Sequence, residues 1–159
     1  MTDSVSPRLE YLPLASAADL DWCARLMSGS EPWLTLGRGY DASLAVLNNP
    51  AKERYLVRHD GTTVGFLILD MTGPFRGYIQ TICMAPEARG RGLGSRVMQW
   101  AEARIFRDSP NVFMCVSSFN EDARRLYARL GFEVVGTLRD YVVAGYDELL
   151  LRKTRGPLT

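Results

Sequence analysis

The sequence is poor in the residues that build disulfide frameworks, metal sites and histidine-dependent catalytic centres. Its 159 residues include only three cysteines and a single histidine. Cys23, Cys83 and Cys115 are odd in number, lie far apart and form no CxxC pair, which argues against a disulfide framework and against a zinc site. We therefore expect buried, reduced thiols and no bound metal.

The one histidine, His59, directly precedes Asp60 and Gly61 between two runs rich in β-forming residues. Asp-Gly is a strong signal for a tight hairpin turn, so we expect His59 at the tip of a hairpin and exposed to solvent. This placement disfavours a nucleophilic triad that depends on histidine.

Excess charge and long apolar runs are also absent. The formal net charge is +1, whereas a nucleic-acid-binding domain usually shows a marked basic excess. No run approaches the ~18 apolar residues of a membrane span, and the polar start of the chain lacks a signal-peptide core. With 47% apolar and 23% charged residues, the composition is that of a globular protein. We expect a cytoplasmic protein that binds neither nucleic acid nor membrane.

The length fits one domain, which we place at residues 8–159 after a flexible tail of residues 1–7. Hydrophobic periodicity, caps and turn residues predict the element order β-α-α-β-β-β-α-β-α-β-β, a mixed sheet flanked by helices. The predicted helices include one capped by Ser16, a short one capped by Asp41, one from about Gly94 to Phe106, and one capped by Asn120.

A glycine-rich turn separates a predicted strand from the third predicted helix. Gly90, Gly92 and Gly94 alternate after Arg89. Such a turn lets backbone N–H groups converge on an anion, and the helix start and the arginines add positive charge, so a phosphate or pyrophosphate is the expected guest. The Walker A pattern is absent, and Ser95 stands where the dinucleotide fingerprint requires its third glycine. A plain turn without a ligand is the alternative.

A second motif follows the next strand, with Asn120, Ala123, Leu126-Tyr127 and Gly131-Phe132 as its fixed positions. With the glycine turn, it resembles the GNAT superfamily of acetyl-CoA-dependent N-acetyltransferases, whose signatures are R/Q-x-x-G-x-G/A and approximately N-x-x-A-x-x-L-Y-x-x-x-G-F. The resemblance covers roughly residues 8–153 and is best over residues 78–136.

The resemblance implies a GNAT-like acyl-CoA N-acyltransferase fold of the α/β (α+β) class. It has a mixed central sheet of about six to seven strands, about four helices and splayed central strands. It also implies acetyl-CoA as co-substrate and no metal. The positions that match the family's coenzyme A site are Ile82, Cys83, Met84, Arg89, Gly90, Arg91, Gly92, Leu93, Gly94, Ser95, Asn120, Ala123 and Tyr127.

Two of these positions have simpler alternatives. The resemblance implies that Asn120 hydrogen-bonds the pantetheine arm of coenzyme A, but Asn120 could instead serve only as a helix cap. Tyr127 is implied to stabilise or protonate the leaving sulfur, yet it also lies on the apolar stripe of its helix and could be a core tyrosine. Because a phenol is a weaker acid than a thiol, Tyr127 could instead relay a proton from the amine.

The general base is where this sequence departs from the family pattern, because Gln80 occupies the position of a common glutamate. Glutamine can orient a water but cannot act as a base. Glu31 ranks first among the substitute carboxylates, ahead of Asp70, Asp140 and Glu148, and a water chain with no protein base is the rival. A covalent intermediate on Cys83 is disfavoured because no histidine is placed to activate it.

The resemblance implies that the segments EPWLTLGRGY and LRDYVVAGY face each other across the acceptor site. From these segments we expect Trp33, Arg38 and Tyr141 to bind the acceptor. The sequence thus predicts an N-acetyltransferase that moves an acetyl group from acetyl-CoA to a primary amine of a small molecule or peptide. The amine would attack directly in a ternary complex. A catalytically silent CoA-binding regulatory module on the same fold is the alternative, and a homodimer is left open.

Overall fold

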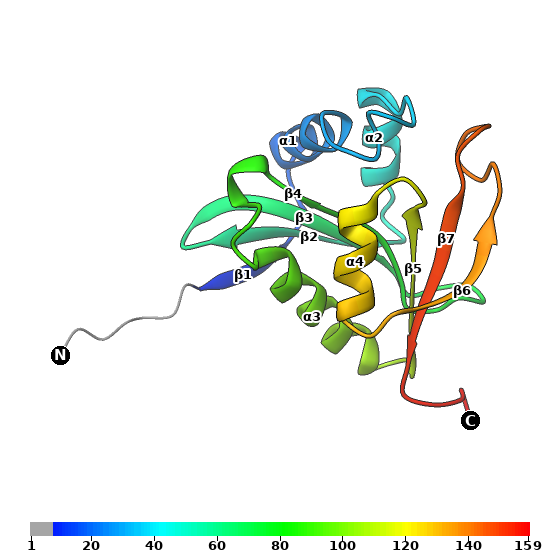
Figure 1. The fold of residues 1–159 in the computed structure, drawn as a ribbon. Helices are drawn as coiled ribbons and strands as arrows, with labels where there is room; N and C mark the ends of the chain where they lie inside the picture. Colours follow the sequence, from blue (N-terminus) through cyan, green and yellow to red (C-terminus); the bar gives the residue numbers. More distant parts are fainter. Residues whose placement is uncertain (1–7) are drawn as a thin grey trace.

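The computed structural model describes residues 8–159, so the predicted tail at residues 1–7 lies outside the described residues (Figure 1). Seven strands form one sheet in the spatial order β1-β2-β3-β4-β5-β7-β6. Their bounds are β1 Leu9–Pro13, β2 Glu53–His59, β3 Thr62–Asp70, β4 Tyr78–Met84, β5 Asn111–Ser117, β6 Glu133–Leu138 and β7 Glu148–Thr154. All neighbouring strands are antiparallel except β4 and β5, which run parallel. The predicted mixed sheet and element order are confirmed.

Four α-helices cover the two faces of the sheet: α1 (Ala17–Ser28), α2 (Tyr40–Leu47), α3 (Leu93–Phe106) and α4 (Glu121–Arg129) (Figure 1). Alternation along β3 divides the core between these faces. Phe66 and Ile68 pack with the buried residues of α1 and α2, whereas Leu67 and Leu69 pack with those of α3. The centre of the sheet is therefore buried on both faces, whereas the edge strand β6 is largely exposed.

The helix ends follow the predicted capping chemistry, with one exception. Ser16 accepts a 3.1 Å hydrogen bond from the amide of Asp19, and Gly131, at φ 95°, follows the end of α4. The exception is Asp41, which lies inside the first turn of α2, while Gly39 occupies the cap position. An acidic residue suits either place, because the helix dipole favours negative charge throughout the first turn.

The hairpin between β2 and β3 turns at Asp60 and Gly61, whose φ angles of 49° and 83° fit the Asp-Gly signal. The expectation of a solvated histidine is wrong, since the His59 side chain is only 17% exposed and its Nε2 atom is buried. His59 is the last residue of β2 and pairs with Leu9 of β1, so it lies inside the sheet and not at the tip of the hairpin.

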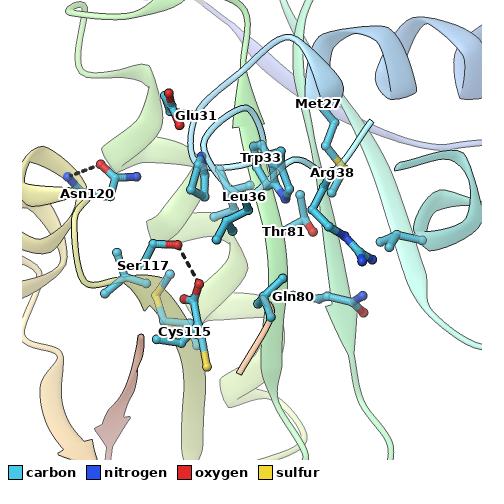
Figure 2. Close-up of a pocket in the computed structure, with 18 of the residues that line it drawn as sticks. Met27, Glu31, Trp33, Leu36, Arg38, Gln80, Thr81, Cys115, Ser117 and Asn120 are labelled. Carbon is cyan, nitrogen blue, oxygen red and sulfur yellow. Dashed lines mark hydrogen bonds between the residues drawn. The ribbon is translucent and has the colours of Figure 1, made fainter. Parts of the chain in front are cut away.

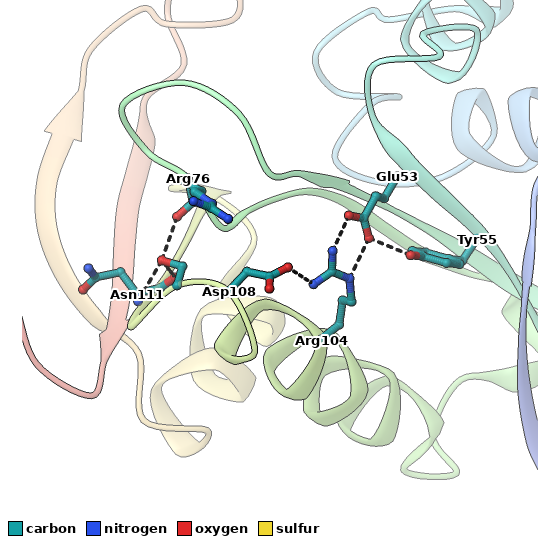
Figure 3. A network of polar contacts seen from close by, with 7 residues as sticks. Glu53, Tyr55, Arg76, Arg104, Asp108 and Asn111 are labelled. Carbon is teal, nitrogen blue, oxygen red and sulfur yellow. Dashed lines mark hydrogen bonds and ion pairs between the residues drawn. The ribbon is translucent and has the colours of Figure 1, made fainter. Parts of the chain in front are cut away.

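A polar network joins α3 to the sheet beside the core (Figure 3). The Arg104 guanidinium donates to both carboxylate oxygens of Glu53 on β2, at 2.9 and 2.6 Å, and to Asp108 at 2.7 Å. Tyr55 donates to the same Glu53 carboxylate at 2.6 Å. This network ties the last turn of α3 to β2.

Among the helices of residues 8–159, none combines the length and the apolar character needed to cross a bilayer.

Candidate active site

The centre of the sheet contains a seam where β4 and β5 separate. The two parallel strands pair only through Tyr78 with Phe113 and Ile79 with Met114, although both strands continue beyond these pairs. Backbone groups on the facing edges beyond Ile79 therefore lack a strand partner. Unpaired backbone groups away from water are costly unless a ligand or water satisfies them, so the seam is a natural site for an amide-bearing ligand. The predicted splaying is confirmed.

Gln80 lies at the start of this seam on a β-bulge. Ile68 of β3 pairs with Thr81 and Leu69 pairs with Ile79, which leaves Gln80 as the extra residue. The Gln80 side chain points away from Ser117 in Figure 2, and its Oε1 atom is buried with no hydrogen-bond partner in the described chain. A buried acceptor without a partner is uncommon in folded proteins and carries a desolvation cost.

The seam opens into a cavity of about 250 Å³ bounded by β4, β5, α4, the segment after α1 and the loop between β6 and β7 (Figure 2). The structure brings most of the predicted side chains together here. Those lining the cavity are Glu31, Trp33, Arg38, Gln80, Ile82, Asn120, Ala123, Tyr127 and Tyr141. The cavity is also lined by Tyr78, Cys115 and Ser117. These residues belong to no sequence motif, and their place at the cavity follows only from the pairing of the strands.

The glycine turn lies at the other end of the seam. Gly90 and Gly92 have φ angles of 76° and 72°, a conformation that favours glycine. Gly94 has no such angle, and a Cβ placed on it would meet no protein atom within 4 Å. Neither backbone strain nor packing therefore accounts for glycine at position 94. Its bare Cα leaves the first-turn amides of α3 open, which fits the close approach of a pyrophosphate.

The arginines of the turn serve the protein's own structure. Arg89 donates to the carbonyl oxygen of Met84 at 3.1 Å and to Oγ of Ser30 at 3.2 Å. Arg91 donates to the carbonyl oxygen of Glu87 at 2.6 Å. These bonds tie the turn to the end of β4 and to the segment after α1. Their role as phosphate donors stays a prediction, and the amides are the groups left open to an anion.

Asn120 and Tyr127 place polar groups at the cavity from α4. Oδ1 of Asn120 accepts a hydrogen bond from the Ala123 amide at 3.4 Å, so the predicted cap is confirmed, and the side-chain nitrogen has no partner within residues 8–159. Burial raises the pKa of Tyr127 to about 12. Its hydroxyl has no hydrogen-bond partner in the described part of the chain. Tyr127 packs on the core and also reaches the cavity, so the two readings of this residue are compatible.

The four candidate carboxylates have different surroundings. Asp70 is paired with Lys52, and Asp140 accepts from the Gly145 amide at 2.7 Å; neither lines the cavity. Glu31 lines it but is exposed, and its carboxylate accepts from both the amide and the hydroxyl of Thr35. Glu148 lines it and is 6% exposed.

The three cysteines are free, and Cys23 and Cys83 are buried as expected, whereas Cys115 is only partly buried. Cys83 is 3% exposed on the α1 and α2 side of the sheet, and burial raises its pKa to about 11, so its side chain is remote from the cavity and only its main chain faces the seam. Burial also raises the pKa of Cys115, which lies beside Tyr78. No group of three or more potential metal ligands occurs among residues 8–159.

Comparison with known proteins agrees with this geometry. The sequence model of the family described as "Acetyltransferase (GNAT) family" matches residues 14–132. An uncharacterized protein of Mycobacterium leprae is 34% identical over 144 residues, covering 86% of this chain and 38% of its own length. The N-alpha-acetyltransferase RimI of Mycobacterium tuberculosis is 31% identical over 147 residues, covering 87% of this chain and 89% of its own. The chain thus spans well under half of the first relative and most of the second.

Solved structures share the fold. An aminoglycoside 6'-N-acetyltransferase complexed with coenzyme A superposes with a TM-score of 0.72 and 14% identity, covering 94% of this chain and 98% of its own. The ribosomal-protein-S18-alanine N-acetyltransferase from Escherichia coli gives a TM-score of 0.71 and 15% identity, covering 96% and 97%. By its family match, its relatives and its splayed sheet, this chain belongs to the acetyltransferase (GNAT) family, whose members use acetyl-CoA.

Proposed function

We propose that this protein is an N-acetyltransferase that transfers the acetyl group of acetyl-CoA to a primary amine. The observation that best supports the proposal is the seam between β4 and β5, which leads from the glycine turn to the cavity beside Tyr127. A ligand held along it would satisfy backbone groups that the sheet leaves unpaired.

Three parts of the chain would bind the acetyl-CoA donor. The open amides at residues 92–95 would hold the pyrophosphate, and the main chain of Ile82, Cys83 and Met84 would pair with the pantetheine amides. The unpartnered side-chain nitrogen of Asn120 would donate to the same arm. When bound, acetyl-CoA supplies a thioester carbonyl that an amine can attack, and backbone amides at the seam would stabilise the oxyanion.

Tyr127 would act at the leaving sulfur. Burial keeps its hydroxyl protonated at neutral pH, since its pKa is raised to about 12, so it is a hydrogen-bond donor throughout the working range. A donor this weakly acidic stabilises a thiolate by hydrogen bonding and relays a proton received from the amine.

On the acceptor side, Trp33 and Arg38 approach from the segment after α1, and Tyr141 from the loop between β6 and β7. The M. tuberculosis relative is named an N-alpha-acetyltransferase, and the E. coli structure is named for an alanine of ribosomal protein S18. These names favour the α-amine of a peptide or protein as the acceptor, with a small-molecule amine as the alternative. Gln80 lines the cavity, but its Oε1 atom is closed to solvent, so its side chain would have to turn before it could accept a hydrogen bond from the amine.

A panel of amines, amino acids and peptides assayed for thiol release from acetyl-CoA tests the proposal. We expect at least one amine to accelerate thiol release well above hydrolysis. The rival function, a silent CoA-binding module, is favoured by Gln80 in place of a basic carboxylate. Thermal stabilisation by CoA without turnover on any amine would establish the rival.

A further inference from the structure

We propose that Glu148, on β7, receives the acceptor's ammonium group and removes its first proton, with Ser117 as the positioning residue. This inference rests on the proposed function and assigns the base that Gln80 cannot provide. The carboxylate would thus come from the strand on the far side of β5 rather than from β4.

The position of Glu148 follows from the pairing of β5 with β7. Glu148 is the first residue of β7 and pairs with Ser117, the last residue of β5, at the end of the seam where β4 has already moved away. The hydroxyl of Ser117 donates a 2.6 Å hydrogen bond to Oε1 of Glu148, drawn as the dashed line at Ser117 in Figure 2. Because this bond holds one oxygen, the carboxylate has a fixed orientation. The other oxygen, Oε2, has no partner among residues 8–159, and it is not sealed from solvent.

A carboxylate this buried needs a cation, and the described chain supplies none. Glu148 has no ion pair within residues 8–159, and Ser117, its hydrogen-bond partner, is neutral. Tyr78 and Cys115 interact with Glu148, and burial raises the pKa of both, so both are neutral at neutral pH. Tyr141 lines the same cavity from the loop between β6 and β7 and supplies no positive charge. Arg38 lines the same cavity but is exposed and makes no ion pair with Glu148. An unpaired buried charge is costly, so the incoming ammonium is the group that completes this site.

The surroundings also suit proton transfer. Burial raises the pKa of Glu148 above the ordinary carboxyl range, which brings its basicity closer to that of an amine. Glu31, the other carboxylate at the cavity, lacks these properties because it is exposed and both of its oxygens accept from Thr35. Glu148 therefore replaces Glu31 as the first choice for the base.

The proton balance is complete without a further reactant. The ammonium gives one proton to the Glu148 carboxylate, leaving a neutral amine and a neutral acid. The nitrogen lone pair forms the new N–C bond, the C–S bond breaks with its electron pair on sulfur, and the second amine proton reaches that sulfur through Tyr127. Glu148 then releases its proton to solvent.

The test uses tri-alanine amide, whose single titrating group is an α-amine with a pKa of about 8. Its N-acetylated form, which has no ammonium, is the ligand control. Glu148→Gln keeps an acceptor for Ser117 but removes the charge, Glu31→Gln tests the rival carboxylate, and Glu133→Gln on the exposed strand β6 is the matched protein control. For each variant, kcat/KM for the amide is measured from pH 6 to 9 at saturating acetyl-CoA.

We expect Glu148→Gln to lower kcat/KM about 10- to 100-fold at pH 7, the effect of losing one charge-assisted contact. The loss should shrink toward pH 9, where the amine deprotonates unaided, while CoA binding stays unchanged. An unaltered pH profile in Glu148→Gln, or a loss in Glu31→Gln alone, overturns the inference but leaves the proposed function intact.

A second readout does not depend on turnover. In the CoA-saturated protein, the ¹³C-labelled side-chain carboxyl of Glu148 is assigned by its absence in Glu148→Gln and followed through a pH titration. Tri-alanine amide should shift this resonance and lower the pKa of Glu148, whereas the N-acetylated control should not. If tri-alanine amide changes neither the chemical shift nor the pKa of this carboxyl, the inference is overturned. Failure of the wild-type protein to bind CoA would instead overturn the proposed function.

Discussion

The ring of Tyr127 meets the ring of Phe132 edge to face, with centroids 6.3 Å apart and planes inclined by 66°. The contact involves the faces and edges of the two rings and does not use the Tyr127 hydroxyl. Packing and chemistry can therefore be separated at this position.

Tyr127→Phe should leave the fold and CoA affinity intact and lower kcat. Loss of a proton donor in an acyl transfer costs about 10²- to 10⁴-fold in rate. The measurement is thiol release with the best acceptor found, beside a calorimetric titration with CoA. An undiminished kcat would remove Tyr127 from the mechanism, and a weakened CoA titration would reassign it to binding.

Gly94→Ala should separate stability from cofactor binding. Alanine is favoured over glycine in a helix by up to about 1 kcal/mol, and the added Cβ meets no protein atom, so the melting temperature should hold or rise. CoA affinity should nevertheless fall about tenfold or more, because the methyl group obstructs the approach of a phosphate to the first-turn amides. Unchanged affinity would mean that the glycine turn does not hold the pyrophosphate.

Arg104→Ala should destabilise the fold by about 1–2 kcal/mol without altering the catalytic groups. Burial by itself raises the pKa of Glu53, but hydrogen bonds from Arg104 and Tyr55 outweigh it and hold that pKa below its usual value. A carboxyl with a lowered folded-state pKa stabilises the protein above its unfolded-state pKa of about 4.3, and this contribution is lost as the pH falls through the folded value.

The loss of unfolding free energy in Arg104→Ala, measured by urea unfolding, should therefore be largest at pH 7 and become smaller below about pH 4. Arg129→Ala on exposed α4 is the control and should remain near wild type. A deficit that does not change with pH would show that Arg104 acts through packing rather than charge.

Glu148→Gln should be at least as stable as the wild-type protein at neutral pH. Burial raises the pKa of Glu148, so the wild-type chain loses stability as the pH rises from about 4.3 through that higher folded value. Glutamine is neutral throughout, so the difference in melting temperature should grow above pH 4 and then level off. Lower stability of the variant at pH 7 would indicate that the carboxylate is stabilised by a charge in the folded protein.

The local features of the fold were accessible from the sequence because they depend on neighbours in the chain. Asn120 at its cap, Gly131 beyond α4 and Asp60-Gly61 at the hairpin each follow from short-range backbone chemistry. Asp41 was misplaced because a first-turn acid and a capping acid differ by only one or two residues in the sequence. His59 was taken as solvated because the hairpin signal does not reveal that β2 also pairs with β1, some 50 residues away in the chain.

The seam and the carboxylate at its end depend on long-range register. Glu148 was one of four candidates, and only the pairing of β5 with β7 brings it beside Ser117, 31 residues earlier. The hydrogen bonds of Arg89 to Met84 and Ser30 could not be predicted from the sequence either. An arginine in a phosphate-binding motif looks the same in sequence whether it binds the phosphate or supports the loop. Short-range patterns indicate most caps and turns, whereas the neighbours of a strand residue in space depend on pairings between distant segments.

The brief pairing of β4 with β5 has a mechanical consequence. Among residues 8–159, β4 and β5 pair directly through only two residue pairs, although the two halves of the sheet also share a packed core. A bound thioester arm would therefore act as an eighth, removable strand across the remaining gap. A ligand that binds only the folded state raises its stability in proportion to the logarithm of ligand concentration. We expect the resistance of this protein to proteolysis to rise and fall with the supply of its own acyl donor.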